Sequence, residues 1–319
     1  MAFFPRDVAA PVPVPHSPVR WEETACILCG RRHWRQLVEA PDARAGAAGR
    51  WFAVVQCLEC GCTFTNPRPN IESIGQFYQL DYEPHRTPRR IKARWHRFGL
   101  PGRASRRLPW RGPGRLLDVG CGNGSFLEQA HAQGWEVTGV DMVVPTEVMR
   151  RAGNRYPILL GSLPHPDLEA ASFDVVTMWQ SLEHVHDPLT LLHEVRRLLL
   201  PGGKLLVTVP NIDGASSRWF GAAWVGLDLP RHLTHFSPAT LHRLLQRAGF
   251  HVGPVGMVRH PAWIRASAQL ARQRFGGAWW HSLLRTRFGS GLAAWYAYLT
   301  FQSDCLLVTA ERQPERGFL

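Results

Sequence analysis

Long hydrophobic runs are missing from this chain of 319 residues. No stretch reaches the ~20 consecutive apolar residues that a helix needs to cross a bilayer. The first 20 residues contain five prolines where a secretory signal would have its apolar core. These absences predict a cytoplasmic protein whose residues 1–20 form a flexible, proline-rich tail. In that compartment, paired cysteines indicate metal ligands rather than disulfides.

Acidic residues are missing from two further stretches. No Asp or Glu occurs between Glu83 and Asp118 or between Asp228 and Asp304, although these stretches contain 20 basic residues. The net charge of +12 is therefore regional, which favours an anionic partner: RNA, a phosphorylated substrate or an acidic membrane surface. Membrane contact would place the protein peripherally at the inner membrane face. Lysine is also scarce, with two residues against 35 arginines, so a solvated arginine-rich surface is the alternative interpretation.

Four of the seven cysteines occur in two Cys-x-x-Cys-Gly units, CILCG and CLECG. Each unit offers two thiolates about one turn apart, and four thiolates make a closed tetrahedral zinc site. The pattern predicts a structural zinc ribbon over residues 21–68. For His33 and Cys62, a surface histidine and a free thiol are favoured over ligand roles. The predicted zinc ligands are Cys26, Cys29, Cys57 and Cys60.

The stretch from Arg115 to Asp141 combines an apolar strand, a glycine-rich turn, a helix and a second strand that ends on an acid. The glycines let the backbone turn sharply and approach a ligand, and the start of the helix offers free N–H groups. Asp141 is placed to accept hydrogen bonds from a ribose diol. The context predicts a nucleotide-cofactor site rather than a glycine turn without a ligand.

Four motifs point to a known family. An acid followed by x-Gly-x-Gly-x-Gly extends from Asp118 to Gly124, and FDVV, LEHVHDP and LLLPGGKLLVTVPN begin at Phe173, Leu182 and Leu198. The first resembles motif I of class I S-adenosylmethionine-dependent methyltransferases, and the other three resemble the ubiquinone-type small-molecule group of that family. The cysteine module in front is similar to that of bacterial sugar and natural-product methyltransferases.

The resemblance implies an α/β fold with a Rossmann-like, seven-stranded sheet, one strand of which is antiparallel. It assigns residues 113–319 to the methyltransferase domain and leaves residues 69–112 as a helical and basic linker. Ile71–Tyr82 is expected to be helical, whereas the basic stretch Arg86–Arg111 interleaves aromatic and charged residues. That mixture suits RNA, a membrane interface or a mobile linker.

S-adenosylmethionine is the implied cofactor. The resemblance places Asp118 near its ammonium group and the turn after the third strand beside the adenine, and Met142 after Asp141 is a further candidate. The candidate cofactor residues are Asp118, Gly120, Gly122, Gly124, Asp141, Met142, Ser162, Leu163 and Gln180.

Methyl transfer to a hydroxyl group or an enol-type carbon needs a base. His184, which follows the predicted fourth strand, is the first candidate base, with a core histidine as the alternative role. His232, in the loop after the fifth strand, is the second candidate. In the resembling group this locus reads Glu-x-x-Glu-His and holds a divalent metal, but Gln180 replaces the first Glu here. The candidate substrate residues are Tyr78, Glu183, Arg231 and His235.

Residues 261–301 lie between the predicted sixth and seventh strands, where a short hairpin would suffice. They contain five arginines, no acid and many aromatic residues. We expect an inserted helical segment that serves as a lid, a dimer face or an interfacial membrane contact.

Three functions fit the sequence. The first is methylation of an oxygen or carbon atom of a small molecule, such as a sugar nucleotide or a secondary-metabolite or cell-surface precursor. The second is RNA methylation with the ribbon and the basic stretch gripping the phosphates. The third is a non-catalytic scaffold that binds zinc and a nucleotide. No Asn/Asp-Pro-Pro-Tyr motif follows Trp179, which argues against methylation of a base amino group. The oligomeric state is left open.

Overall fold

The computed structural model describes residues 18–42, 50–78 and 108–313. Most of the predicted tail and of the predicted basic stretch Arg86–Arg111 lies outside these residues, as does the end of the predicted helix Ile71–Tyr82. The part of that helix inside them is only a 3-10 turn, η1 (Ile74–Phe77), followed by extended backbone at Tyr78. Gly75 and the side-chain contact from Asn70 to the Ser73 N–H favour a turn over a longer helix.

The central sheet has the strand order β12-β14-β10-β9-β6-β7-β8. An eighth strand, β13, pairs with β14 on the same side as β12, so that the sheet is seven strands wide. All neighbours from β8 to β10 are parallel, whereas β14 is antiparallel to β10 and to β12 and β13. The predicted sixth strand is split in two, because Pro254 between its halves has no N–H to donate to β14. The predicted seven-stranded sheet with one antiparallel strand is thus confirmed. Its strands are β6 (Arg115–Val119), β7 (Glu136–Asp141), β8 (Ile158–Leu160), β9 (Phe173–Trp179), β10 (Leu199–Pro210), β12 (Phe250–Val252), β13 (Gly256–Val258) and β14 (Cys305–Arg312).

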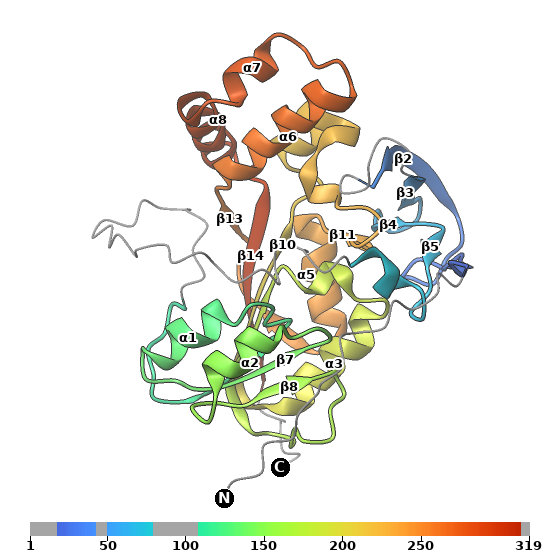
Figure 1. Ribbon diagram of the computed structural model, residues 1–319. Helices are drawn as coiled ribbons and strands as arrows, with labels where there is room; N and C mark the ends of the chain where they lie inside the picture. Colours follow the sequence, from blue (N-terminus) through green and yellow to red (C-terminus); the bar gives the residue numbers. More distant parts are fainter. Residues whose placement is uncertain (1–17, 43–49, 79–107, 314–319) are drawn as a thin grey trace, which may run out of the picture.

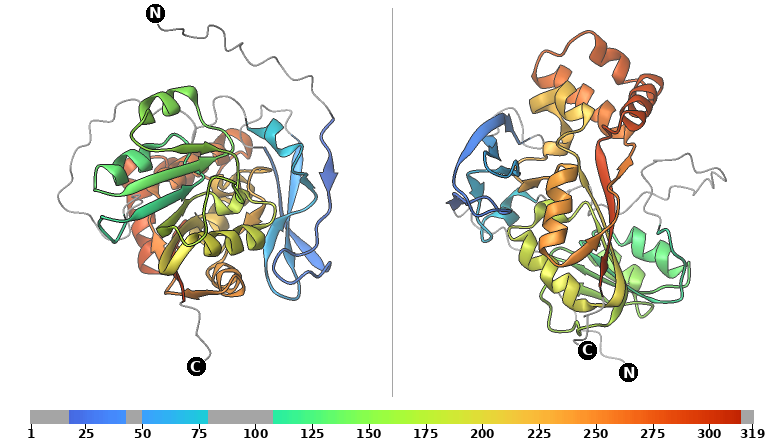
Figure 2. Two further views of the ribbon diagram at one scale, coloured as in Figure 1. Left: turned by 90° about the horizontal axis from the view of Figure 1, so that it is seen from below. Right: turned by 180° about the vertical axis from the view of Figure 1, so that it is seen from behind.

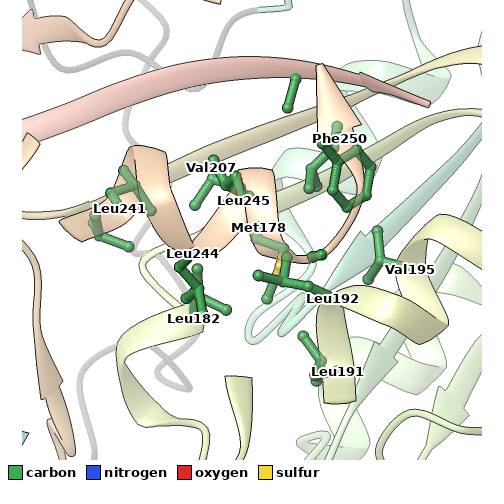
Figure 3. Close-up of a cluster of buried hydrophobic side chains, with 14 of the residues drawn as sticks. Met178, Leu182, Leu191, Leu192, Val195, Val207, Leu241, Leu244, Leu245 and Phe250 are labelled. Atoms are coloured by element: carbon green, nitrogen blue, oxygen red, sulfur yellow. The ribbon is translucent and has the colours of Figure 1, made fainter. Parts of the chain in front are cut away.

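Helices cover both faces of this sheet (Figure 1). Alternate residues of each strand point to opposite faces. Leu116, Val175 and Leu206 pack with α1 (Ser125–His131) and α2 (Thr146–Ala152) on one face. The next residues along the same strands pack with α3 (Pro188–Leu198) and α5 (Pro238–Arg247) on the other. Figure 3 shows Leu192 and Val195 of α3 and Leu244 and Leu245 of α5 meeting around Met178 and Val207. Burial of each such side chain contributes about 1.5–3 kcal/mol.

The two helices of this second face begin at strong caps. Asp187 accepts a hydrogen bond from the Thr190 N–H at the start of α3, and Pro188 occupies its first turn. Ser237 and Thr240 form a capping box at the start of α5. The Ser237 hydroxyl accepts the N–H of Thr240.

A second sheet contains the cysteine module. Its order is β11-β4-β3-β2, and all its pairs are antiparallel. Its outermost strand β11 (Thr234–His235) comes from the long loop after β10, so the module is continuous with the methyltransferase domain. The other strands are β2 (Trp34–Pro41), β3 (Trp51–Cys57) and β4 (Thr63–Thr65), while β1 (Trp21–Glu22) pairs with β5 (Arg68–Pro69) beside them.

Three helices form the predicted insert: α6 (Pro261–Arg274), α7 (Trp280–Leu284) and α8 (Arg287–Leu299). They protrude beyond the end of β10, with α4 (Ala215–Phe220) below them (Figures 1 and 2). Within the described ranges, no helix has the length and apolar content needed to span a bilayer.

Candidate active site and metal centre

The glycine turn lies at the carboxyl end of β6. Gly120, Gly122 and Gly124 have φ values of 78°, 51° and 68°, which side chains rarely adopt. A Cβ on Gly120 would also lie 2.6 Å from the Cβ of Ser181. The sequence therefore uses glycine here for both backbone conformation and close approach.

The acid at the end of β7 is tied to this turn. One oxygen of Asp141 accepts the Gly122 N–H at 2.7 Å, and the other accepts the Val143 N–H at 3.0 Å. Next to it, the side chain of Met142 is 64% exposed, which leaves an apolar surface open to a flat ring. The structure thus brings together the turn and two of the predicted cofactor residues.

The turn after β8 lies on the same edge. Leu160 pairs with Asp141 in the sheet, and the Gly161 N–H donates to the Asp141 carbonyl at 2.9 Å. Ser162, which follows, is exposed, whereas Leu163 is buried. A contact with adenine is therefore open to Ser162, and Leu163 supports the turn from below.

Asp118 lies beneath the glycine turn rather than on its surface. Its side chain is 1% exposed, and one oxygen accepts the Thr177 hydroxyl of β9 at 2.7 Å. Direct contact with the cofactor's ammonium group, which the resemblance implied, does not agree with this burial. We propose instead that Asp118 supports the turn.

Gln180 follows β9 in a left-handed conformation, with a φ of 56°. Its N–H donates to the Thr208 carbonyl at 3.0 Å. Its side-chain carbonyl oxygen is buried without a hydrogen-bond partner among the described residues. Strained backbone and an unsatisfied acceptor together are typical of a ligand site.

A cluster of one acid and two histidines lies beside Gln180. The turn η3 (Leu182–His184) carries Glu183 and His184, and His232 reaches them from the loop after β10. Ligand-type atoms of the three side chains lie within 4.8 Å of one another, and the two imidazole rings meet edge to face with centroids 4.6 Å apart. The Leu233 N–H donates to the Glu183 carbonyl at 2.8 Å, which fixes the loop against the turn.

Burial sets the protonation of two members of this cluster. Glu183 is fully buried, and desolvation raises its pKa to about 8, so that its carboxyl group is mostly protonated at neutral pH. Desolvation lowers the pKa of His232 well below its usual value, with the neighbouring His184 lowering it further. His232 is therefore neutral. Its Nε2 lies 3.9 Å from a Glu183 oxygen and 3.9 Å from an Asp228 oxygen.

His184 is the half-buried member of the cluster. Its Nδ1 lies 3.0 Å from the Arg231 carbonyl and 2.9 Å from the Tyr78 hydroxyl. A carbonyl can only accept, so a hydrogen bond to Arg231 requires the proton on Nδ1 and leaves the lone pair on Nε2. This tautomer is the one that a base acting through Nε2 needs. Tyr78, predicted as a substrate residue, lies behind the imidazole instead.

The other three predicted substrate residues, Glu183, Arg231 and His235, are buried within the protein. The Arg231 guanidinium is 1% exposed, and its nitrogens donate to Asp42 at 2.6 Å, to Asp228 at 2.9 Å and to the Phe77 carbonyl at 2.9 Å. The predicted substrate contact of Arg231 is therefore wrong for this conformation, because its donors already have partners.

His235 is likewise enclosed. It lies on β11, where its Nε2 is 3.1 Å from the Thr65 hydroxyl, and burial lowers its pKa to about 3. It links β11 to β4 within the second sheet and has no surface for a substrate, contrary to the prediction. Its neighbour Thr65 also donates its hydroxyl to the His232 carbonyl at 2.7 Å.

Sequence reasoning missed the acids that organise this loop. Asp228 lies beside both Arg231 and His232, and Asp42 comes from the end of β2. A signal for Asp228 exists in the sequence, since it is the last acid before the long acid-free stretch. Asp42 offers no such signal, because its partner is 189 residues away along the chain.

The four predicted zinc ligands come together in one cluster. The sulfur atoms of Cys26 and Cys60 are 3.4 Å apart, and those of Cys29 and Cys57 are 3.6 Å apart. Zn–S bonds of about 2.3 Å in a tetrahedron place sulfur atoms about 3.8 Å apart, so the cluster fits the ion.

Backbone N–H groups also point at these sulfurs. Leu28 and Cys29 donate to Cys26, and Glu59 and Cys60 donate to Cys57. Gly30 and Gly61 end the two loops in a left-handed backbone conformation, with φ values of 75° and 74°. A bound zinc would hold these loops together as a structural element, since all four positions are cysteine and none is open to a substrate.

Residues 84–254, just over half of the chain, match a family model described as a methyltransferase domain. The ubiquinone biosynthesis O-methyltransferase of Xanthomonas axonopodis pv. citri is 32% identical over 161 residues, which cover 47% of this chain and 67% of that protein. The enzyme of the same name from Cereibacter sphaeroides is 36% identical over 166 residues, covering 48% of this chain and 67% of that protein.

Solved structures give weaker likenesses. A Burkholderia thailandensis 1,6-didemethyltoxoflavin-N1-methyltransferase is 21% identical, with a TM-score of 0.42, over 63% of this chain and 72% of that one. An S-adenosylmethionine-dependent methyltransferase from Mesorhizobium loti is 24% identical, with a TM-score of 0.43. The match covers 64% of this chain and 94% of that one. Both scores are low, so the fold is judged from the strand order itself.

The strand order and the glycine turn define a class I methyltransferase fold. With the family match, the chain belongs to the methyltransferase domain family. It is an enzyme that uses S-adenosylmethionine as its methyl donor.

Proposed function

We propose that this enzyme methylates a hydroxyl oxygen of a small organic acceptor, with His184 as the base. The observation that carries the proposal is the position of His184, half-buried at the carboxyl edge of the sheet with Nδ1 at the Arg231 carbonyl. The related enzymes from Xanthomonas and Cereibacter carry names that specify O-methylation.

The chemistry needs a base for an oxygen acceptor. When bound, S-adenosylmethionine would supply a methyl group on a sulfonium, and transfer to the acceptor oxygen would break the carbon–sulfur bond and release S-adenosylhomocysteine. His184 takes the hydroxyl proton at Nε2, while the carbonyl of Arg231 holds the other ring nitrogen. An amine would attack through a free lone pair without such help. An enol-type carbon acceptor also needs a base, so it is the second candidate.

Glu183 and His232 are the buried neighbours of the base. The raised pKa of Glu183 and the lowered pKa of His232 keep both side chains largely uncharged near neutral pH. They therefore present no fixed charge to His184. We assign His232 to this supporting role, because its Nδ1 lies 2.9 Å from the Gly226 carbonyl and its side chain is 8% exposed.

Among finer acceptors, a sugar nucleotide and a secondary-metabolite or cell-surface precursor are the alternatives. RNA methylation, which the basic stretch suggested, is an outcome of the test below that contradicts the proposal.

The test is transfer of tritiated methyl from S-adenosylmethionine to a panel of nucleotide sugars, phenols, polyhydroxy metabolites and RNA. Mass spectrometry and NMR of the product then locate the new methyl group. An O-methylated small molecule supports the proposal, whereas labelled RNA or an N-methylated product contradicts it.

His184→Ala should reduce kcat by about 100-fold or more, within the range that general base catalysis contributes. Donor binding, measured by calorimetry, should change little, because His184 is assigned to the acceptor and not to the donor. His251→Ala, an exposed histidine on β12, is the matched control. Unchanged turnover in His184→Ala would remove this residue from the role of base.

A further inference from the structure

We propose that the helical insert binds an anionic lipid bilayer through the outer surface of α7 and α8. The surface extends from Trp279 to Phe301 and lies outside residues 84–254, the range of the family match. The proposal does not depend on which acceptor is methylated.

Helix α8 has its large apolar residues on the outside. Phe288, Leu292, Tyr296 and Leu299 are 73%, 56%, 56% and 69% exposed. Steps of four, four and three residues put them on one side of the helix. The small residues Ser290, Ala294 and Ala297 are buried instead. A helix that faces only water has the opposite arrangement.

The inner side of α8 is firmly attached. The Arg259 guanidinium, which follows β13, lies 3.6 Å from the centre of the Trp295 ring. Arg265 of α6 donates to the Ser290 hydroxyl at 3.0 Å. The exposed residues are therefore held outward by packing on the other side, so they are not the result of a loosely placed helix.

Neighbouring residues extend the apolar surface. Trp279, just before α7, is 84% exposed, Leu283 within α7 is 55% exposed, and Phe301, just after α8, is 76% exposed. Figure 1 shows α7 at the outer end of the insert and α8 beyond the end of β13. Aromatic side chains of this kind are enriched at the level of lipid headgroups.

The charge of the same segment fits an anionic surface. Arg285 and Arg287 are exposed in this segment, Arg272 of α6 is exposed next to it, and the sequence has no acid from residue 229 to residue 303. Arginine places its charge among headgroups while its alkyl stem packs on apolar groups. Anionic lipids attract such residues until salt screens them.

Two other occupants fit less well. A second copy would bring two positive, acid-free surfaces together, and like charges across an interface oppose association. RNA would stack on Trp279 and Phe288, but it offers nothing apolar to Leu283, Leu292 and Leu299. A bilayer accommodates the aromatic, aliphatic and basic residues together.

The binding test uses co-sedimentation of the full chain with vesicles. Vesicles of phosphatidylcholine with phosphatidylglycerol should bind the protein, and vesicles of phosphatidylcholine alone should bind it much more weakly. The triple variant Phe288→Ser/Leu292→Ser/Leu299→Ser should lose about tenfold or more in partition to anionic vesicles. Arg285→Gln/Arg287→Gln should lose affinity mainly at low salt, where charges are least screened.

The controls are chosen from other exposed apolar residues. Leu37→Ser/Ile71→Ser changes residues that are 42% and 66% exposed but lie away from the insert, Leu37 in the cysteine module and Ile71 just after it, and it should leave vesicle binding unchanged. Circular dichroism and donor binding confirm that each variant is folded. Absence of binding to anionic vesicles by the natural sequence overturns the proposal. So does equal binding by the triple variant, or loss of a dimer or of RNA binding in that variant with vesicle binding intact.

Discussion

Glu183 is a carboxyl group in the interior that has no hydrogen-bond partner for either oxygen among the described residues. A carboxylate in such a place is costly, and the pKa of about 8 expresses that cost. The group therefore serves best as a neutral, polar neighbour of the two histidines. The sequence motif contains Glu next to His, but the protonation state of Glu183 depends on its burial, which the motif does not show.

This protonation makes a prediction for stability against pH. In the unfolded chain Glu183 ionises near pH 4.5, whereas in the folded protein it keeps its proton up to about pH 8. Between these values ionisation favours the unfolded state, so Glu183 lowers the free energy of unfolding by up to about 1.4 kcal/mol per pH unit as pH rises. Glu183→Gln cannot ionise, so its stability relative to the natural sequence should increase from pH 4.5 to about pH 8 and then level off.

Urea unfolding across this range measures the difference. Glu169→Gln, at an exposed position, is the control and should show no such trend. A constant difference between Glu183→Gln and the natural sequence at all pH values would mean that Glu183 is ionised in the folded protein.

Asp141 has a separate role at the residue scale. It holds the glycine turn through two backbone N–H groups and ends the strand where the resemblance placed a ribose contact. Asp141→Ala should weaken donor binding by about 10-fold to 100-fold, since hydrogen bonds to a charged group contribute about 1.5–3 kcal/mol. Asp141→Asn keeps the size and one acceptor and should lose less. Calorimetry with S-adenosylmethionine measures both, and equal affinity in Asp141→Ala would remove the residue from the cofactor site.

At the scale of elements, the cysteine module and the loop after β10 form one unit. Strand β11 of that loop is the edge strand of the module's sheet, and Thr65 of β4 bonds to the backbone of the loop at His232 and Leu233. Arg231 adds an ion pair to Asp42. We propose that the module, predicted over residues 21–68, folds together with the domain predicted over residues 113–319 and positions His232.

Loss of zinc should therefore reach the active site. Cys57→Ser/Cys60→Ser should abolish the expected one zinc per chain, measured by atomic emission, and lower the melting temperature. Methyl transfer should fall further than donor binding, because the glycine turn belongs to the other sheet. Cys62→Ala, a buried cysteine outside the four-sulfur cluster, should keep the metal. Normal turnover without zinc would separate the module from catalysis.

The sequence predicted elements best where a local pattern determines them. The glycine turn, the alternating strands and the two cysteine units each specify a conformation within a few residues, and all three appear in the structure. The site was less predictable. Arg231 and His235 looked suitable for a substrate, but their partners Asp42 and Thr65 lie far away in the sequence. Burial decides whether such a residue contacts a substrate or supports the fold, and burial is a property of the assembled fold.

At the scale of the whole molecule, the insert and the active site share one edge of the central sheet. Pro210, at the carboxyl end of β10, pairs with Cys305 of β14, and Cys305 pairs with Val258 of β13. The insert therefore begins and ends at the edge where the parallel strands present the cofactor and the base. Two strands that are hydrogen-bonded into the sheet form this connection, and no long linker intervenes.

Such a rigid connection has a kinetic consequence. If α7 and α8 rest on a bilayer, the carboxyl edge of the sheet is held at a fixed height and orientation above it. An acceptor anchored in the same leaflet would then meet the base by diffusion in two dimensions. Turnover would follow the surface density of that acceptor rather than its concentration in bulk solution.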